Sequence, residues 1–190
     1  MVIHFAGQTK PYVLILDVEH DQEKLIQVAG LLFTRVGDSL YQIAKNFNFY
    51  IKQKEISKWI QRYLDITPAI LIEKGIELKE FKEIFESQII NDIDVDDLVV
   101  ISHGIHQDDL VLYHNGINIG CFEQECTYNM SKWILERQNN IKLSDVAQEF
   151  GYVVLHEHNA YADAWATAAV YSVLSKLQEE QNYEDIGYES

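Results

Sequence analysis

Apolar positions in the first quarter of the chain form short, dense runs. Residues 11–19 read Pro-Tyr-Val-Leu-Ile-Leu-Asp-Val-Glu, a continuous apolar run ending in two acids that is typical of a buried central strand. Residues 25–36 form a second β-branched run, and residues 41–51 alternate between apolar and polar positions. Gly37-Asp38 supplies a turn between these two segments. The pattern predicts three strands in an antiparallel meander.

After residue 55 the apolar positions change to helical spacing. They recur every three or four residues in 56–64 and again in 81–89, which predicts two helices. We expect a short strand at 98–102, a helix after Gln107, and two short helices around 133–135 and 143–150, the second in a position to be capped by Ser144. A long alanine-rich helix is expected from Tyr161 to Leu177. Strands followed by alternating helices and strands predict an α/β fold with a mixed sheet.

Length and composition are those of one globular domain. Of the 190 residues, 47% are hydrophobic and 24% are charged, which is ordinary for a folded protein with a real core. No linker rich in Gly, Ser or Pro divides the chain. We therefore expect a single domain over residues 1–177. Residues 178–190 hold five acids and no basic residue, which predicts an acidic, flexible tail.

The charge balance limits the partners. Fifteen basic against 30 acidic residues give a net charge of −15, which argues against a large basic surface for nucleic acid or an anionic membrane. Contacts to phosphate can still be made through bound cations. There is no apolar run of the roughly 20 residues that a membrane span needs, and residues 1–10 lack the apolar core of a signal peptide. With only Cys121 and Cys126 and no disulfide framework, we expect a cytoplasmic protein.

Two acidic motifs are candidates for chemistry. Asp17 and Glu19 are two residues apart on a predicted strand, so their side chains share a face. Two buried like charges are costly unless a cation neutralises them, and carboxylate oxygens suit Mg²⁺ or Mn²⁺. Asp108, with the adjacent Asp109 as a rival, follows the strand at 98–102. The simpler alternatives are a solvated strand end for the first motif and a helix cap for the second.

The last motif opens the final helix with the sequence His158-Asn-Ala-Tyr-Ala-Asp163. This spacing lets His158 and Asp163 face the same cleft, and an imidazole titrates near neutral pH, which suits a general base. Alone, the motif is better explained by a surface histidine and an acid near a positive helix end. Together, however, the four carboxylates form the ligand set of a two-metal phosphodiester site, in which the metals lie roughly 3.5–4 Å apart.

This order of motifs resembles the DEDDh family of 3′–5′ exonucleases, the DnaQ-like group. The similarity extends beyond the acids to residues 25–30, 103–112 and 142–151, so it covers nearly the whole chain, from Tyr12 to Leu177. It implies a ribonuclease-H-like fold, with helices flanking a mixed five-stranded sheet of three antiparallel and two parallel strands. His20-Asp21-Gln22 departs from the Thr-Thr-Gly that usually follows the first motif.

The resemblance also implies a role for each candidate residue. Asp17, Glu19, Asp108 and Asp163 match the metal-binding carboxylates, and His158 matches the general base. A sister subgroup has a tyrosine four positions before the last aspartate, where this chain has Asn159, so the histidine subgroup is favoured. The implied activity is a nuclease that uses two Mg²⁺ or Mn²⁺ ions to release nucleoside 5′-monophosphates from single-stranded 3′ ends.

Several alternatives stay open at this stage. A protein that keeps the fold as a nucleic-acid or protein interaction module is the main rival to an enzyme. The sequence does not distinguish DNA from RNA and does not give the oligomeric state. His103, His106 and His114 would need a further, unidentified ligand to bind zinc. Trp59, Trp133 and Trp165 lie at apolar helix positions, which favours core packing over base stacking.

Overall fold

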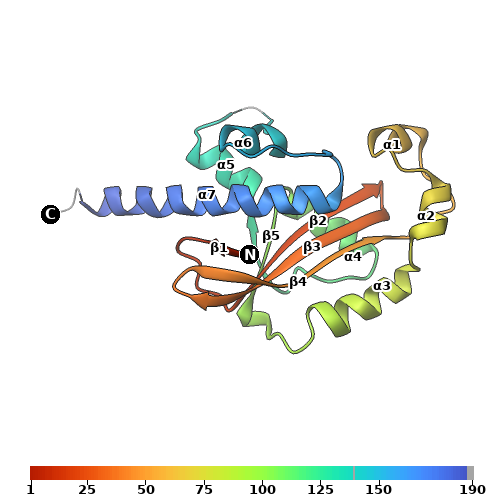
Figure 1. The fold of residues 1–190 in the computed structure, drawn as a ribbon, viewed down its shortest axis with the longest axis horizontal. Coiled ribbons are helices and arrows are strands. Elements are labelled where there is room, and N and C mark those ends of the chain that lie inside the picture. The colour runs from red at the N-terminus through yellow and green to blue at the C-terminus, as the bar shows by residue number, and fades with distance from the viewer. Residues whose placement is uncertain (139, 188–190) are drawn as a thin grey trace.

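Within the residues that the computed structural model describes, 1–138 and 140–187, six strands form one mixed sheet (Figure 1). Their order across the sheet is β1-β4-β3-β2-β5-β6. Strands β1 to β4 pair antiparallel, whereas β5 and β6 run parallel to β2. The strands are β1 (Val2–His4), β2 (Tyr12–Asp21), β3 (Lys24–Gly37), β4 (Leu40–Tyr50), β5 (Leu98–Ser102) and β6 (Glu123–Cys126).

The predicted meander and the strand at 98–102 are confirmed, but the sheet has six strands instead of five. The additional antiparallel strand is β1, a three-residue strand at one edge of the sheet. At the opposite edge, the parallel strand β6 reads Glu-Gln-Glu-Cys. Strand β1 is too short for a period to be read from it, and β6 is polar, so no hydrophobic pattern marks either edge strand in the sequence.

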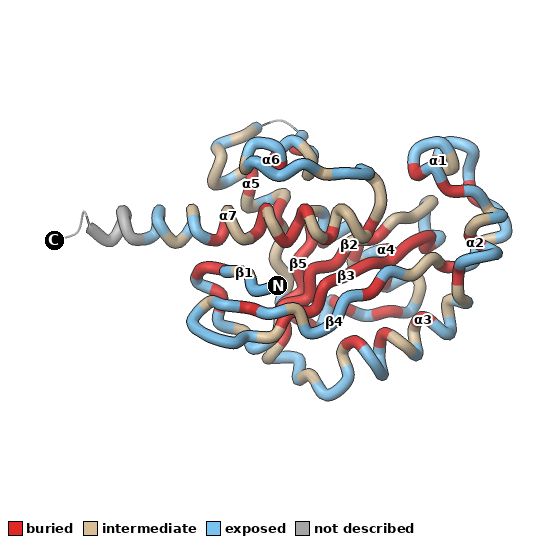
Figure 2. Tube along the Cα trace, in the orientation of Figure 1, coloured by how far each residue is buried: buried red, intermediate tan, exposed pale blue. Residues whose placement is uncertain are grey.

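Strand β2 lies in the middle of the sheet and is covered on both faces. Its even-numbered residues from Leu14 to Val18 pack with Phe81, Phe85 and their neighbours. Its odd-numbered residues Val13 and Ile15 pack against the small side chains of the last helix, α7. Figure 2 shows this buried centre of β2 and β3 beneath α7. Because side chains alternate along a strand, positions 17 and 19 continue the face that α7 covers.

Helices surround the sheet in the order that the sequence predicts, with one addition. The additional helix is α2, which begins at Pro68. The side chain of Thr67 caps this helix. Helix α6 begins directly after Lys142, so Ser144 lies inside the helix and does not cap it. The helices are α1 (Lys58–Tyr63), α2 (Pro68–Lys74), α3 (Leu78–Ile84), α4 (Ile105–His114), α5 (Thr127–Ile134), α6 (Leu143–Glu149) and α7 (Ala160–Gly187).

Helix α7 ends at Gly187, ten residues beyond the expected end at Leu177. Its first half presents alanines such as Ala164 and Ala168 to the sheet. Glu, Gln and Lys are good helix formers, so the helix continues after the core contacts end. The segment expected as a flexible tail is therefore helical over 178–187, and residues 188–190 lie outside the described residues. No described helix has the length and apolar character needed to cross a membrane.

Two of the three tryptophans do not lie in the core. Trp59 is 65% exposed and Trp133 is 85% exposed, which contradicts the expected core packing. Only Trp165 packs against the buried cluster beneath α7. In α1, the helical turn directs Ile60 inward, and Trp59 lies next to it on the outer side. A single apolar neighbour therefore does not place an aromatic residue in the core.

Candidate active site

Three carboxylates meet where α7 begins above the end of β2. One oxygen from each of Asp17, Glu19 and Asp163 lies within 4.8 Å of the other two. Asp17 and Glu19 share the α7 face of β2, and Asp163 lies in the first turn of α7. In the part of the chain that the structure describes, no other three His, Cys, Asp or Glu side chains come together in this way.

The fourth expected carboxylate lies at the edge of this group. Asp108 is only 7% exposed, in the first turn of α4, and its carboxylate accepts a hydrogen bond from the Ser102 hydroxyl at the end of β5. Its charge helps to raise the pKa values of Asp17 and Glu19. The carboxylate of Asp109 instead lies beside Gly120. The structure thus brings Asp108, and not Asp109, to the cluster.

The electrostatics of the cluster favour a bound cation. Burial raises the pKa of Glu19 to about 8, and the charges of Asp163 and Asp108 add to this shift. Burial likewise raises the pKa of Asp108 to about 7, that of Asp163 to about 6, and that of Asp17 well above its ordinary value. No described Lys or Arg forms an ion pair with these four acids. A divalent cation fits such a set of oxygen ligands.

These pKa shifts predict that the metal-free protein loses stability as pH rises. The four carboxyl groups have higher pKa values in the folded chain than in the unfolded chain, so the folded state holds more protons between pH 4 and pH 8. This contribution is complete at low pH and is lost as pH rises through the folded pKa values. In chelator, we expect the melting temperature to fall by roughly 5 °C between pH 5.5 and 8.5. Bound Mn²⁺ should remove most of this fall in melting temperature, which thermal melts with and without Mn²⁺ would measure. An equal fall under both conditions would contradict the assignment.

His158 lies beside the cluster in a constrained loop. Its φ is 64°, in the left-handed region that few residues other than glycine adopt. Its backbone N–H donates to Asp163 Oδ2 at 3.0 Å, and its ring stacks on Tyr63 with ring centroids 4.0 Å apart. His158 precedes α7 by two residues, and the side chain of Asn159 accepts hydrogen bonds from the first turn. Non-glycine residues held at positive φ are often found at functional sites.

A cleft opens next to His158 and Asp163. Its volume is about 300 Å³, near the lower end for ligand pockets. Most of the residues that line it carry polar side chains: Tyr63, Asn140, Lys142, Leu143, Ser144, Glu157, His158 and Asp163. Burial raises the pKa of the Tyr63 phenol, and the charges of Glu19 and Asp163 add to this shift. Because Asp163 belongs both to the lining and to the carboxylate cluster, the cleft and the carboxylates form one site.

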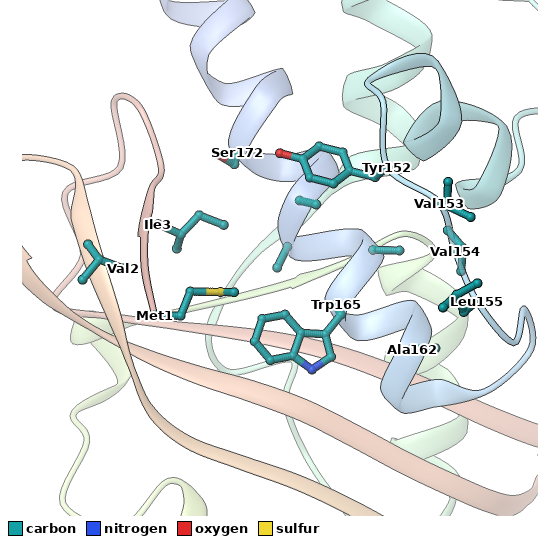
Figure 3. A pocket seen from close by; sticks show the side chains of 13 residues that line it. Met1, Val2, Ile3, Tyr152, Val153, Val154, Leu155, Ala162, Trp165 and Ser172 are labelled. Carbon is teal, nitrogen blue, oxygen red and sulfur yellow. The ribbon is translucent and has the colours of Figure 1, made fainter.

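A larger pocket lies elsewhere on the molecule. It has a volume of about 520 Å³ between β1 and the start of α7, and Figure 3 shows Met1, Tyr152 and Trp165 around it. No Asp, Glu, Lys, Arg, His or Cys side chain lines this pocket. Its lining therefore offers no carboxylate, imidazole or thiolate ligand for a metal, and Tyr152 is the one titratable side chain in it. The smaller cleft at the carboxylates is the candidate active site.

Some site residues were not evident from the sequence. Tyr63 and Lys142 come from separate segments, and only the fold brings them to the cleft. Gln27 is fully buried on β3, and its side chain accepts a hydrogen bond from the N–H of Ala160, which fixes the start of α7 over the sheet. A buried polar residue within an apolar strand was the one available signal for Gln27.

The three histidines considered for zinc do not form a site within the described residues. The ring nitrogens of His103 hydrogen-bond Thr127 and the carbonyl of Ile141. His114 instead lies near Glu23, with its Nδ1 3.7 Å from the carboxylate. His103 thus has a structural role, in which it connects β5 to two distant segments.

Replacing Ser102 should weaken metal binding through Asp108. The Ser102 hydroxyl donates to the Asp108 carboxylate and accepts from the N–H of Gly104, so it fixes the orientation of Asp108. Groups that orient metal ligands in this way are commonly worth 10- to 100-fold in affinity. We expect Ser102→Ala to weaken Mn²⁺ binding, measured by calorimetry, by about 10-fold. Ser144→Ala, a matched change of a serine on the cleft wall, should leave Mn²⁺ affinity unchanged; equal affinities for wild type and Ser102→Ala would refute this role.

Comparisons with known proteins agree with this geometry. A protein-family model described as "Exonuclease", that of the RNase T family, matches residues 14–171. No curated protein matches the chain in a sequence comparison. Solved structures with the same fold include E. coli Exonuclease I with a dA16 oligonucleotide, at a TM-score of 0.68 and 17% identity over 90% of this chain. Exonuclease X in complex with 5′ overhanging duplex DNA gives a TM-score of 0.64 and 17% identity over 86% of this chain.

The extent of these matches differs between the two relatives. This chain spans 42% of the length of Exonuclease I and 91% of that of Exonuclease X. The expected ribonuclease-H-like exonuclease fold is confirmed, with six strands in its mixed sheet. The family model covers most of the chain, from the middle of β2 well into α7, and so includes all four clustered carboxylates. The chain belongs to the RNase T/DnaQ-like exonuclease family.

Proposed function

We propose that the protein is a metal-dependent 3′–5′ exonuclease that releases nucleoside 5′-monophosphates from DNA or RNA. The observation that carries this proposal is the meeting of Asp17, Glu19 and Asp163 within 4.8 Å, with Asp108 beside them, in a chain of an exonuclease family. Four carboxylates match the ligand requirement of a two-metal phosphodiester hydrolase. The proposal therefore rests on a set of ligands as well as on family membership.

The four carboxylates would hold two Mg²⁺ or Mn²⁺ ions, which supply Lewis-acid stabilisation of the charge that develops on phosphate. Burial and the charges of Asp108, Glu19 and Asp163 raise the pKa of Asp17, which a cation held among these acids would offset. Asp163 belongs both to the cluster and to the lining of the cleft, and the Ser102 hydroxyl orients Asp108.

His158 would act as the general base that accepts a proton from the attacking water. Three features support this role. Its backbone N–H is fixed to Asp163, its ring plane is held by Tyr63, and it lines the cleft in which a terminal nucleotide would lie. A positioned base of this kind accelerates hydrolysis without being a metal ligand. The imidazole would then transfer the proton, and the carboxylates would hold the metal ions.

The proposed substrate is nucleic acid with a free, single-stranded 3′ end. Structures of Exonuclease I contain dA16 and dT13 oligonucleotides. A net charge of −15 disfavours a broad basic surface on this chain. Recognition would therefore depend on cations at the cleft and on local contacts to the terminal nucleotides.

The test is degradation of single-stranded DNA and RNA labelled at the 5′ end, with the 3′ end either free or blocked, in Mg²⁺, Mn²⁺ or chelator. We expect a ladder shortened from free 3′ ends in metal and intact strands in chelator. A blocked 3′ end should prevent the ladder, whereas a blocked 5′ end should not. If all strands remain intact but still bind the protein, an interaction module with the exonuclease fold would replace this proposal.

A further inference from the structure

An aromatic column leads from the candidate active site to the molecular surface. Trp59 and Tyr63 stack with ring centroids 4.8 Å apart and an interplanar angle of 14°, and the other side of Tyr63 contacts the ring of His158 at 4.0 Å and 30°. Trp59 is 65% exposed and Tyr63 is 44% exposed. The column therefore begins at His158, the proposed general base, and ends at the solvent-exposed indole of Trp59.

The helix that carries the column is fixed to the site by other residues. Helix α1 buries Ile60 in a cluster with Ile26 and Leu71, on the side away from the aromatic pair. The N–H of Ser57 donates to Asp21 Oδ2 at 2.6 Å, and the Ser57 hydroxyl caps the helix. Asp21 lies at the end of β2, two residues after Glu19. The helix is thus attached to the strand that carries the metal ligands, and Figure 1 shows α1 beyond the end of that strand.

The aromatic pair has no evident packing role. Trp59 and Tyr63 are one helical turn apart and lie on the same face of α1, with neither ring in a buried cluster. The two rings instead form one continuous aromatic surface that is open to solvent. Flat, exposed aromatic rings are the surfaces on which unpaired bases stack.

The local charge supports a nucleic-acid partner. Residues 52–63 contain four basic side chains and one acid, whereas the whole chain carries 15 basic and 30 acidic residues. Lys58 and Arg62 are both exposed on α1, next to Trp59 and Tyr63 in sequence. Among the described residues, neither forms an ion pair. Cations beside stacked aromatic rings are the combination that binds single-stranded nucleic acid without reading its sequence.

From these observations we infer that Trp59 and Tyr63 form a stacking platform for unpaired bases of a single strand whose 3′ end enters the cleft, with Lys58 and Arg62 contacting its phosphates. This inference rests on the proposed function and adds to it the surface that would hold the strand. Bases inside a duplex are already stacked on both faces, so a platform of this kind favours unpaired bases over duplex DNA. The bases would continue the column on the outer face of Trp59.

The test measures binding separately from turnover. Asp163→Asn serves as the background that blocks cleavage, and the anisotropy of 5′-fluorescein oligonucleotides of about ten nucleotides reports affinity. The ligands are single-stranded DNA, single-stranded RNA and a DNA in which the nucleotides near the 3′ end are abasic. We expect Trp59→Ala to raise the Kd for base-containing strands at least about 5-fold, the low end of the effect of one stacked base. Trp59→Phe should recover part of this loss because it keeps a flat ring.

Matched controls identify stacking as the cause. Trp133→Ala removes a tryptophan that is even more exposed but lies on α5, and it should leave the Kd unchanged. Abasic DNA should bind the unchanged background weakly, and Trp59→Ala should not weaken it further. Lys58→Gln with Arg62→Gln should lower the slope of log Kd against log salt by about 0.7 for each lost phosphate contact. The DNA and RNA arms show which backbone the platform accepts.

Three results would overturn the inference. Equal affinity of Trp59→Ala and Trp133→Ala would show that the indole does not contact bases. Equal loss for abasic and base-containing strands would show that the helix binds through phosphate alone. A changed oligomeric state of Trp59→Ala, with unchanged oligonucleotide binding, would assign the surface to contacts between copies. A wild-type protein that binds strands through Trp59 but never shortens them would instead refute the proposed exonuclease function and leave the platform standing.

Discussion

Asp163→Asn should abolish nuclease activity and make the metal-free protein more stable. The substitution removes one of three carboxylates that lie within 4.8 Å of one another, while the amide oxygen can still accept the hydrogen bond from the His158 N–H. Loss of a ligand should lower kcat by about 10³-fold or more, equivalent to ~4 kcal/mol of transition-state stabilisation. Loss of a repelling charge should raise the melting temperature in chelator by roughly 2–4 °C at pH 8.

The opposite directions of these two effects distinguish a metal ligand from a structural acid. A structural acid would lose stability and activity together when it is replaced. Asp109→Asn is the matched control, because this acid is adjacent to Asp108 but lies beside Gly120. It should keep turnover within about two-fold of wild type. Near-normal turnover of Asp163→Asn would remove Asp163 from the proposed ligand set.

His158→Ala should lower kcat by roughly 10²–10⁴-fold and leave Mn²⁺ affinity close to that of wild type. The imidazole is proposed as a proton acceptor, and none of its nitrogens is proposed as a metal ligand. The remaining rate should increase with pH because hydroxide replaces the missing base. Single-turnover kinetics on a labelled oligonucleotide, together with calorimetric Mn²⁺ titration, would measure the two effects separately.

The backbone of His158 requires a second variant. At a φ of 64°, alanine adds strain that asparagine largely avoids, so His158→Asn isolates the loss of the ring from a change in the loop. His156→Ala is an internal control, since His156 is exposed and has a φ of 63°. It should be active. A damaging His156→Ala with a mild His158→Ala would move the proposed base by two residues.

The convergence of Asp17 and Glu19 with Asp163 could be predicted from the sequence because part of it follows from a simple periodicity. Residues two apart on a strand share a face, so Asp17 and Glu19 converge as soon as 11–19 is recognised as a strand. The family resemblance then supplied Asp108 and Asp163. The choice between Asp108 and Asp109 needed the structure, because a single residue along α4 exchanges a buried carboxylate bonded to Ser102 for one beside Gly120.

The parts that the sequence did not predict depend on long-range packing. The contact between Tyr63 and His158 joins positions 95 residues apart, and no local pattern reports it. Trp59 was expected in the core because it lies among apolar residues, but only Ile60 and its neighbours on the same stripe face inward. Strand β6 has no apolar residue besides Cys126, so only its pairing with β5 identifies it.

The central claim is that water attacks the terminal phosphodiester and that the 3′ oxygen leaves. The most direct measurement is mass spectrometry of the products formed from a single-stranded oligonucleotide in heavy-oxygen water with Mn²⁺. The account predicts nucleoside 5′-monophosphates that carry one heavy oxygen on phosphorus, an unlabelled shortened strand, and no product in chelator. Nucleosides released from a strand that keeps a labelled 3′-phosphate, or labelled products that form equally well in chelator, would contradict it.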